Sequence, residues 1–86
     1  MPVVSRFFGI VIALYWNDHA PPHFHAKYGG EEVVIEIATG RILKGSLTRR
    51  ALGLVQEWRE THMNELMQDW ELARQRKPLL DISPLE

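Results

Sequence analysis

The chain has 86 residues, of which 45% are hydrophobic and 24% are charged, with ten Lys and Arg against eleven Asp and Glu. This length and composition predict one folded domain over residues 1–86, with one hydrophobic core. The net charge of -1 excludes a general electrostatic attraction of the chain to nucleic acid or membranes, and the lack of cysteine excludes disulfide scaffolds and thiolate metal sites. A chain without cysteine fits a reducing compartment, so we expect a cytoplasmic protein.

The first expected element is a strand over residues 6–16, RFFGIVIALYW. One Arg followed by an apolar run resembles a weak signal peptide. The run is, however, shorter than the roughly 20 residues that a membrane-spanning helix needs. Both faces of the strand would be apolar, which is typical of a central strand covered on both sides. We therefore expect a core strand and no membrane segment.

Three more strands are expected, over residues 23–28, 31–37 and 41–45. In the first of these, His23, His25 and Lys27 alternate with apolar residues and therefore share one face. Gly29 and Gly30 follow, and this pair is typical of a two-residue hairpin turn. In the next strand alternate apolar residues are expected to point inward, namely Val33, Ile35 and Ile37. Together these strands predict a four-stranded antiparallel meander.

Apolar residues recur at helical spacing after residue 47, which predicts a helical segment that begins at Ser46 or Thr48 and ends near Arg76. A straight helix of this length would span about 42 Å, whereas a small domain is about 30 Å across. The apolar stripe also rotates between the two halves. A bend or break over residues 60–63 would explain both observations. The alternative is a helix end that overhangs and packs on a second copy of the chain.

The expected fold class is therefore α+β: a four-stranded antiparallel meander followed by a long or broken C-terminal helical segment packed on one face. The last residues, LLDISPLE, are expected to form an extended tail that lays Leu80 and Ile82 on the domain.

Three of the four histidines lie between residues 19 and 25, around the pair Pro21 and Pro22. His23 and His25 are two residues apart on a strand, so their Cα atoms would be about 6.5–7 Å apart and both rings could bind one metal ion. His19 could be the third ligand if the prolines fix the path of the loop. Three imidazoles plus water are the open coordination of catalytic zinc, and histidine also binds nickel, copper and iron.

Several neighbours of the histidines are expected to support such a site. Asp18 could accept the second ring N–H of a metal-bound histidine, and Glu32 and Glu36 on the adjacent strand could join if their faces match. Trp16 and Asn17 come directly before this stretch and are expected to line a pocket beside it.

A second interpretation needs no metal and makes the clustered groups an acid and a base that cleave RNA. The catalytic residues would then be His19, His23, His25 and Asp18. Cations for the phosphate would come from Lys27, Arg49 and Arg50. The two arginines oppose the dipole of the helix that they begin. An anion bound there would explain this; the alternative, which costs only a few tenths of a kcal/mol, is that both are solvated side chains.

A third interpretation belongs to another class: the histidines only shape a surface, and the protein is a non-enzymatic interaction or regulatory module. The alternatives stay open at this point, because two strand histidines and one loop histidine match no specific metalloenzyme motif.

The segment SRFFGIVIALYWNDHAPPHFHAKYGG, with the later RALGLVQEW, is similar to a bacterial family of unknown function, DUF4160. The stretch from Trp16 to Ala26 is its most specific part, with Ala20 at the variable position. The resemblance covers nearly the whole chain.

This resemblance implies a cellular context more than a reaction. Genes of the family often neighbour, or are fused to, another small domain, which has suggested a toxin–antitoxin-like two-gene module. The resemblance therefore implies a small protein partner from a neighbouring gene. It implies no particular catalytic or metal-binding residue.

Overall fold

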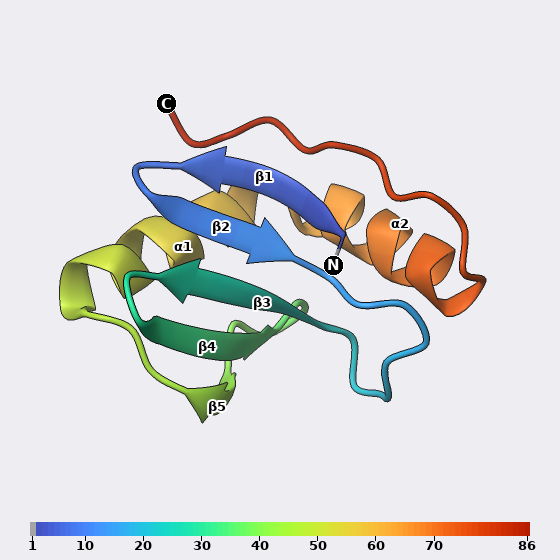
Figure 1. The fold of residues 1–86 in the computed structure, drawn as a ribbon, viewed down its shortest axis with the longest axis horizontal. Coiled ribbons are helices and arrows are strands. Elements are labelled where there is room, and N and C mark those ends of the chain that lie inside the picture. Colours follow the sequence, from blue (N-terminus) through green and yellow to red (C-terminus); the bar gives the residue numbers. More distant parts are fainter. Residues whose placement is uncertain (1) are drawn as a thin grey trace.

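The structure is a computed structural model that describes residues 2–86, and in it one antiparallel sheet is covered on one face by two helices (Figure 1). The strands are β1 (Val3–Phe7), β2 (Ile10–Ala13), β3 (His23–Tyr28), β4 (Glu31–Glu36) and β5 (Ile42–Gly45), and the helices are α1 (Arg49–Thr61) and α2 (Met63–Arg74). The sheet order is β1-β2-β3-β4-β5, so each strand pairs with its neighbour in the sequence. The predicted α+β meander is confirmed, but the sheet has five strands where four were expected.

The additional strand arises because residues 6–16 do not form one strand. Phe7 pairs with Ile10, and the chain reverses at Phe8 and Gly9, whose φ angles are 51° and 81°. Positive φ at both central residues is typical of a type I′ hairpin turn. A phenylalanine rarely adopts positive φ, so the apolar run conceals the turn. The Phe8 side chain is 61% exposed, whereas Ile10 is buried.

The hairpin of β3 and β4 agrees with the prediction and sets the two faces of the sheet. Phe24 and Ala26 of β3 are fully buried against the helices, together with Val33, Ile35 and Ile37. His23 and His25 alternate with these residues and so point to the other side of the strand, although at the start of β3 the His23 ring still reaches Trp70 of α2. The helical segment adds to the same core, among others, Val55, Trp58, Leu66 and Trp70.

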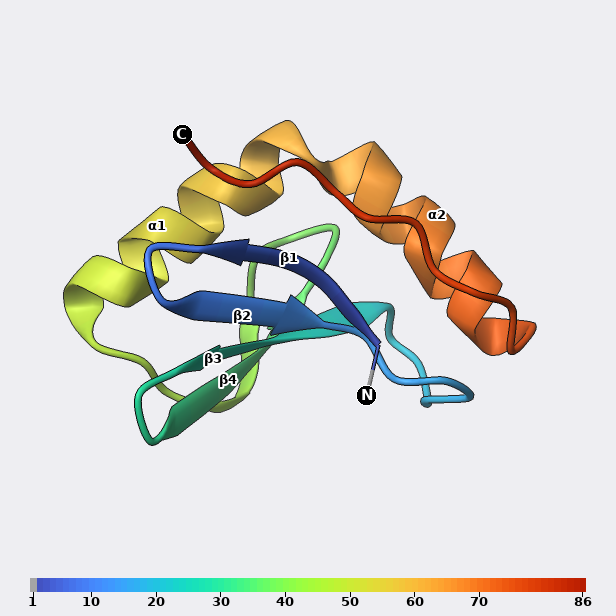
Figure 2. The same cartoon turned by 45° about the horizontal axis from the view of Figure 1, so that its top comes forward.

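The helical segment breaks at His62, within the predicted range 60–63. The His62 backbone N–H donates to the carbonyl of Arg59, and φ at His62 is -128°. Figure 2 shows α1 and α2 arching over the sheet at an angle to each other, so the overhanging helix, the other alternative, does not form. Thr48 caps α1 by accepting the Ala51 N–H, while α2 ends at Arg74, slightly before the expected end.

The tail after α2 returns along the β1 edge of the sheet (Figure 2). The Ile82 N–H donates to the Val4 carbonyl over 2.8 Å, and the Trp58 indole N–H donates to the Ser83 carbonyl over 2.8 Å. Ile82 is buried as expected. Leu80 is 52% exposed, so its expected burial is wrong. The Leu80 N–H donates to Oδ1 of the buried Asp69, and the neighbouring Leu79 packs on the core in place of Leu80.

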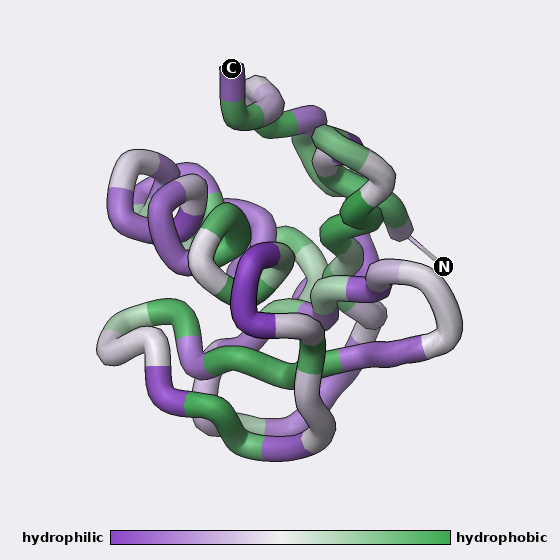
Figure 3. The backbone as a smooth tube through the Cα atoms, turned by 90° about the vertical axis from the view of Figure 1, so that its left-hand side faces the viewer, coloured by the Kyte–Doolittle hydropathy of each residue, from purple (hydrophilic) through white to green (hydrophobic). Residues whose placement is uncertain are grey.

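Figure 3 shows hydrophobic and hydrophilic stretches interleaved along the backbone. Within residues 2–86 no helix has both the length and the apolar character that crossing a bilayer requires.

Candidate metal centre

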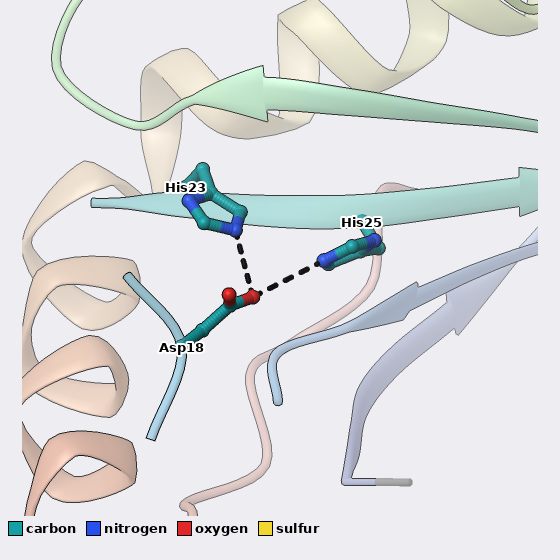
Figure 4. Close-up of side chains that lie close together, drawn as sticks. All are labelled: Asp18, His23 and His25. Atoms are coloured by element: carbon teal, nitrogen blue, oxygen red, sulfur yellow. Dashed lines mark hydrogen bonds and ion pairs between the residues drawn. The ribbon is translucent and has the colours of Figure 1, made fainter. Parts of the chain in front are cut away.

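Asp18, His23 and His25 converge at one end of β3, where the loop from β2 turns back toward the sheet (Figure 4). Asp18 Oδ2 lies 2.8 Å from Nε2 of His23 and 3.6 Å from Nε2 of His25. One nitrogen or oxygen of each residue lies within 4.8 Å of the others. Two imidazoles and one carboxylate this close together are a set that divalent transition metals bind.

The His23 ring is fixed by groups on both of its nitrogens. Its Nδ1 lies 2.7 Å from the carbonyl oxygen of Pro21, which can only accept a hydrogen bond, so Nδ1 carries a hydrogen. This orients Nε2 toward Asp18. The ring is only 5% exposed and packs against the indole of Trp70, with 5.0 Å between the ring centroids. The double-proline loop therefore contributes a backbone acceptor that positions one candidate ligand.

The His25 ring is oriented in the same way by a carboxylate. Its Nδ1 lies 2.8 Å from Oε2 of Glu32 on β4, which places the hydrogen on Nδ1. Its Nε2 is buried and has no hydrogen-bond partner among residues 2–86. The ring of Tyr15 meets it edge-on, with centroids 4.4 Å apart. His25 thus presents Nε2 to the cluster, 3.6 Å from Oδ2 of Asp18, as a metal ligand held by an outer carboxylate does.

The Asp18 carboxylate is electrostatically suited to bind a cation. Burial alone would raise its pKa, but the backbone N–H of His19 and the rings of His23 and His25 hold the pKa below the ordinary value of 3.8. The carboxylate therefore stays ionised at neutral pH.

His19 lies beside this cluster rather than within it. Its side chain is 90% exposed, and its Nδ1 lies 3.1 Å from Oδ1 of Asp18, on the outer side of the carboxylate. The structure therefore brings together two of the three predicted histidines, with Asp18 in the position expected for His19. Of the two predicted glutamates, Glu32 contacts His25, whereas Glu36 accepts a hydrogen bond from Thr39.

Trp16 and Asn17 lie next to the cluster, as their place in the sequence indicates. Trp16 is half-exposed and lines a hollow together with Tyr15. The Asn17 backbone N–H donates to the carbonyl of Ala73 over 3.1 Å and so connects the loop with the end of α2. Asn17 also has φ 59°, a left-handed conformation that asparagine tolerates better than most residues.

Of the three predicted anion-binding residues, Lys27 contacts the same Tyr15 ring as His25, whereas the two arginines lie elsewhere. Lys27 lies over the ring of Tyr15, 5.9 Å from the centroid, and a hydrogen bond with Tyr15 raises its pKa. Arg49 and Arg50 are exposed at the start of α1, and Arg50 lines a different hollow together with Tyr28. Tyr28 is the last residue of β3 and His23 is the first, so these arginines lie at the far end of the strand.

Two further groups contribute to the site without having been predicted. The Pro21 carbonyl is a backbone group, and no residue type indicates it. Tyr15 is an aromatic residue three positions before Asp18 in the sequence. Its contact with the His25 ring depends on the pairing of Ala13 with His25 in the sheet, which the spacing alone does not indicate. Asp18 itself was expected to support the ligands rather than join them.

The fold and this cluster define a class: a small α+β protein whose antiparallel meander carries a histidine–carboxylate site at one end of the sheet. The model of the family described as "Domain of unknown function (DUF4160)" matches residues 9–71, so the chain belongs to this family, and the resemblance noted in the sequence is confirmed. The matched range includes Asp18, His23, His25 and Glu32. No curated protein and no solved structure matches the chain.

Proposed function

We propose that this protein binds a divalent transition metal ion, such as zinc, through Asp18, His23 and His25. The observation that carries the proposal is the orientation of the two rings. Each ring has its Nδ1 held by an oxygen acceptor, so each Nε2 faces Asp18. Outer acceptors of this kind orient metal-bound histidines.

The ligand set narrows the class of metal ion. Two nitrogens and one oxygen suit zinc, iron(II), nickel and copper, whereas calcium and magnesium prefer oxygen ligands. Three protein ligands leave coordination positions for water or a substrate, which is typical of catalytic sites rather than closed structural ones. An ion in such a site supplies a Lewis acid and an activated water.

The test is a zinc titration by calorimetry, on protein purified without a polyhistidine tag and stripped with EDTA. We expect equimolar binding in the unchanged protein. His25→Ala should weaken it by more than about 100-fold, because even residues that only orient ligands contribute about 10–100-fold. His19→Ala is the matched control, since His19 lies beside the cluster, and it should bind zinc normally. Undiminished zinc binding in His25→Ala would refute the proposal.

Cleavage of RNA by acid–base catalysis is supported less well, because Arg49 and Arg50 lie at the far end of β3 from the histidines. RNA cleavage without a metal predicts that overproduction of the protein arrests growth. His25→Ala should then relieve the arrest both in metal-depleted and in metal-replete cells.

For the cellular context we infer a bacterial cytoplasmic protein that acts with a small protein partner from a neighbouring gene, in a toxin–antitoxin-like module. This inference rests on family membership and not on the site. Co-purification of the neighbouring gene product tests it. If the protein is only an interaction module, the partner should be retained by a variant with alanine at both His23 and His25.

A further inference from the structure

An open hollow of about 610 Å³ lies on the surface next to the candidate metal centre. Its lining is aromatic and apolar and consists of Pro2, Val3, Tyr15, Trp16, Pro78 and Leu79. The chain has three tryptophans; Trp58 and Trp70 are buried in the core, whereas Trp16 is 50% exposed. An exposed indole at the edge of a hollow offers a flat face on which another ring can stack.

Two neighbouring residues connect the hollow with the metal centre. Tyr15 lines the hollow, and its ring also meets the His25 ring with 4.4 Å between centroids. Trp16 precedes Asp18 by two residues in the same loop. A molecule bound in the hollow would therefore lie beside the histidine–carboxylate cluster.

Positive charge flanks the same hollow. Arg76 and Lys77 directly precede Pro78, are exposed, and form no ion pair within the part of the chain that the structure describes. The carbonyl of Ala73 accepts both the Arg76 N–H and the Asn17 N–H, each over 3.1 Å, so the backbone of Arg76 lies against the loop that carries the site. Two adjacent exposed cations thus precede a residue that lines the hollow, on a chain whose net charge is -1.

We propose that the hollow binds one nucleotide of a single-stranded nucleic acid, with the base stacked on Trp16 and the phosphate held by Arg76 and Lys77. An aromatic ring beside cations is the combination that binds single strands without sequence readout. The hollow is open at the surface, whereas pockets for free small molecules usually bury most of the ligand. A strand that continues across the surface fits it better than a free nucleotide. This inference goes beyond metal binding and does not depend on it.

The probe for the test is a fluorescently labelled RNA of about eight nucleotides, within the span that such sites cover. Its binding is followed by anisotropy in EDTA, so that no metal contributes. Trp16→Ala should weaken binding by about 5- to 150-fold, the range for loss of one stacked base. A double change, Arg76→Gln with Lys77→Gln, should weaken binding and reduce the slope of log affinity against log salt by up to about 1.4.

The matched control is Arg49→Gln with Arg50→Gln, which removes two exposed cations at the far end of β3. It should leave affinity and salt slope unchanged. Absence of RNA binding by the unchanged protein, wild-type affinity in Trp16→Ala, or equal losses in both double variants would overturn the proposal. If AMP displaced the labelled RNA as effectively as the unlabelled RNA does, the assignment of the hollow to a single-stranded nucleic acid would be overturned.

Two further measurements keep these outcomes interpretable. Trp16 is half-exposed, so Trp16→Ala should fold, and its circular dichroism and melting temperature verify this. Zinc titration of the same variant should still show equimolar binding. A failure of the nucleic-acid proposal is thereby distinguished from a failure of the metal proposal.

Discussion

The Nε2 atom of His23 lies 2.8 Å from Oδ2 of Asp18, while Nδ1 of the same ring lies 2.7 Å from the Pro21 carbonyl. Both neighbouring oxygens are acceptors, so the ring satisfies both only when both nitrogens carry hydrogens. A metal ion between Nε2 and Asp18 would replace the proton there. Nε2 of His23 is therefore placed to hold either a hydrogen or a metal ion opposite Asp18.

Neutralising Asp18 should destabilise the metal-free protein at neutral pH. The pKa of Asp18 is held below 3.8, so its contribution to folding is present above that pH and is lost as the pH falls through the lower folded-state value. Asp18→Asn replaces charge-assisted hydrogen bonds by neutral ones and should reduce the free energy of unfolding by about 1 kcal/mol. Urea titrations in EDTA at pH 7 and near pH 3 measure this, and the difference should shrink in acid. The exposed Glu57→Gln is the control and should change little.

The course of the chain was predictable where one local signal dominated. Gly29 and Gly30 marked the β3–β4 hairpin, and the rotating apolar stripe placed the helix break near His62. The β1–β2 hairpin was not predictable, because its turn uses Phe8 and Gly9 within an apolar run that has no polar turn residue. Gly9 alone marked the turn, and the phenylalanine before it masked that signal.

The site was predictable as a location but not as a set of ligands. Alternation along β3 put His23 and His25 on one face, because strand geometry fixes that relationship. In a loop, the spacing of residues in the sequence does not determine which side chains point in the same direction. Asp18 points inward and His19 outward because the loop is held by the Asn17 bond to α2 and by the contacts of Asp18 itself, which are tertiary interactions.

Arg76 occupies a backbone position that favours glycine. Its φ is 57°, and it follows the end of α2, where the Lys77 N–H donates to the Leu72 carbonyl. Arg76→Gly should therefore stabilise the fold by about 1 kcal/mol, by removing the strain of the left-handed conformation. Thermal unfolding measures the gain, expected to be about 4–8 °C. If nucleic-acid binding weakens in Arg76→Gly, the arginine side chain contributes to binding and not to folding. A melting temperature below that of the unchanged protein would contradict the assigned backbone strain at Arg76.

The buried carboxyl of Asp69 should make stability depend on pH in the opposite direction to Asp18. Burial raises its pKa above 3.8 despite the hydrogen bond from the Leu80 N–H, and its Oδ2 has no partner among residues 2–86. A raised pKa gives stability that is complete below pH 3.8 and is lost as the pH rises through the folded-state value. Asp69→Asn cannot ionise, so it should melt a few degrees higher than the unchanged protein at pH 7. The two proteins should converge below about pH 4; an equal difference at both pH values would exclude ionisation as the cause.

Gly45 is required by the close approach of β5 to β4. Its φ is 75°, and a Cβ there would lie 2.1 Å from the backbone oxygen of Glu32. Gly45→Ala should therefore cost about 2 kcal/mol or more in unfolding free energy. Gly30→Ala is the control, because a Cβ at Gly30 meets nothing within 4 Å and should alter stability by less than about 1 kcal/mol. Urea unfolding compares the two variants, and similar losses in both would contradict the assigned close contact.

Glu32 should control metal affinity without touching the metal. Its Oε2 lies 2.8 Å from Nδ1 of His25, which keeps the hydrogen on that nitrogen and leaves Nε2 facing Asp18. Glu32→Gln removes the charge and offers an amide that can also donate, so the ring is no longer held in one tautomer. Zinc affinity should fall by about 10-fold or more, the range seen when an outer partner of a metal-bound histidine is changed. Glu31→Gln changes the exposed neighbour and should bind zinc as the unchanged protein does. Because equal affinities in the two variants would mean that Glu32 does not orient His25, the comparison tests the arrangement on which the metal proposal depends.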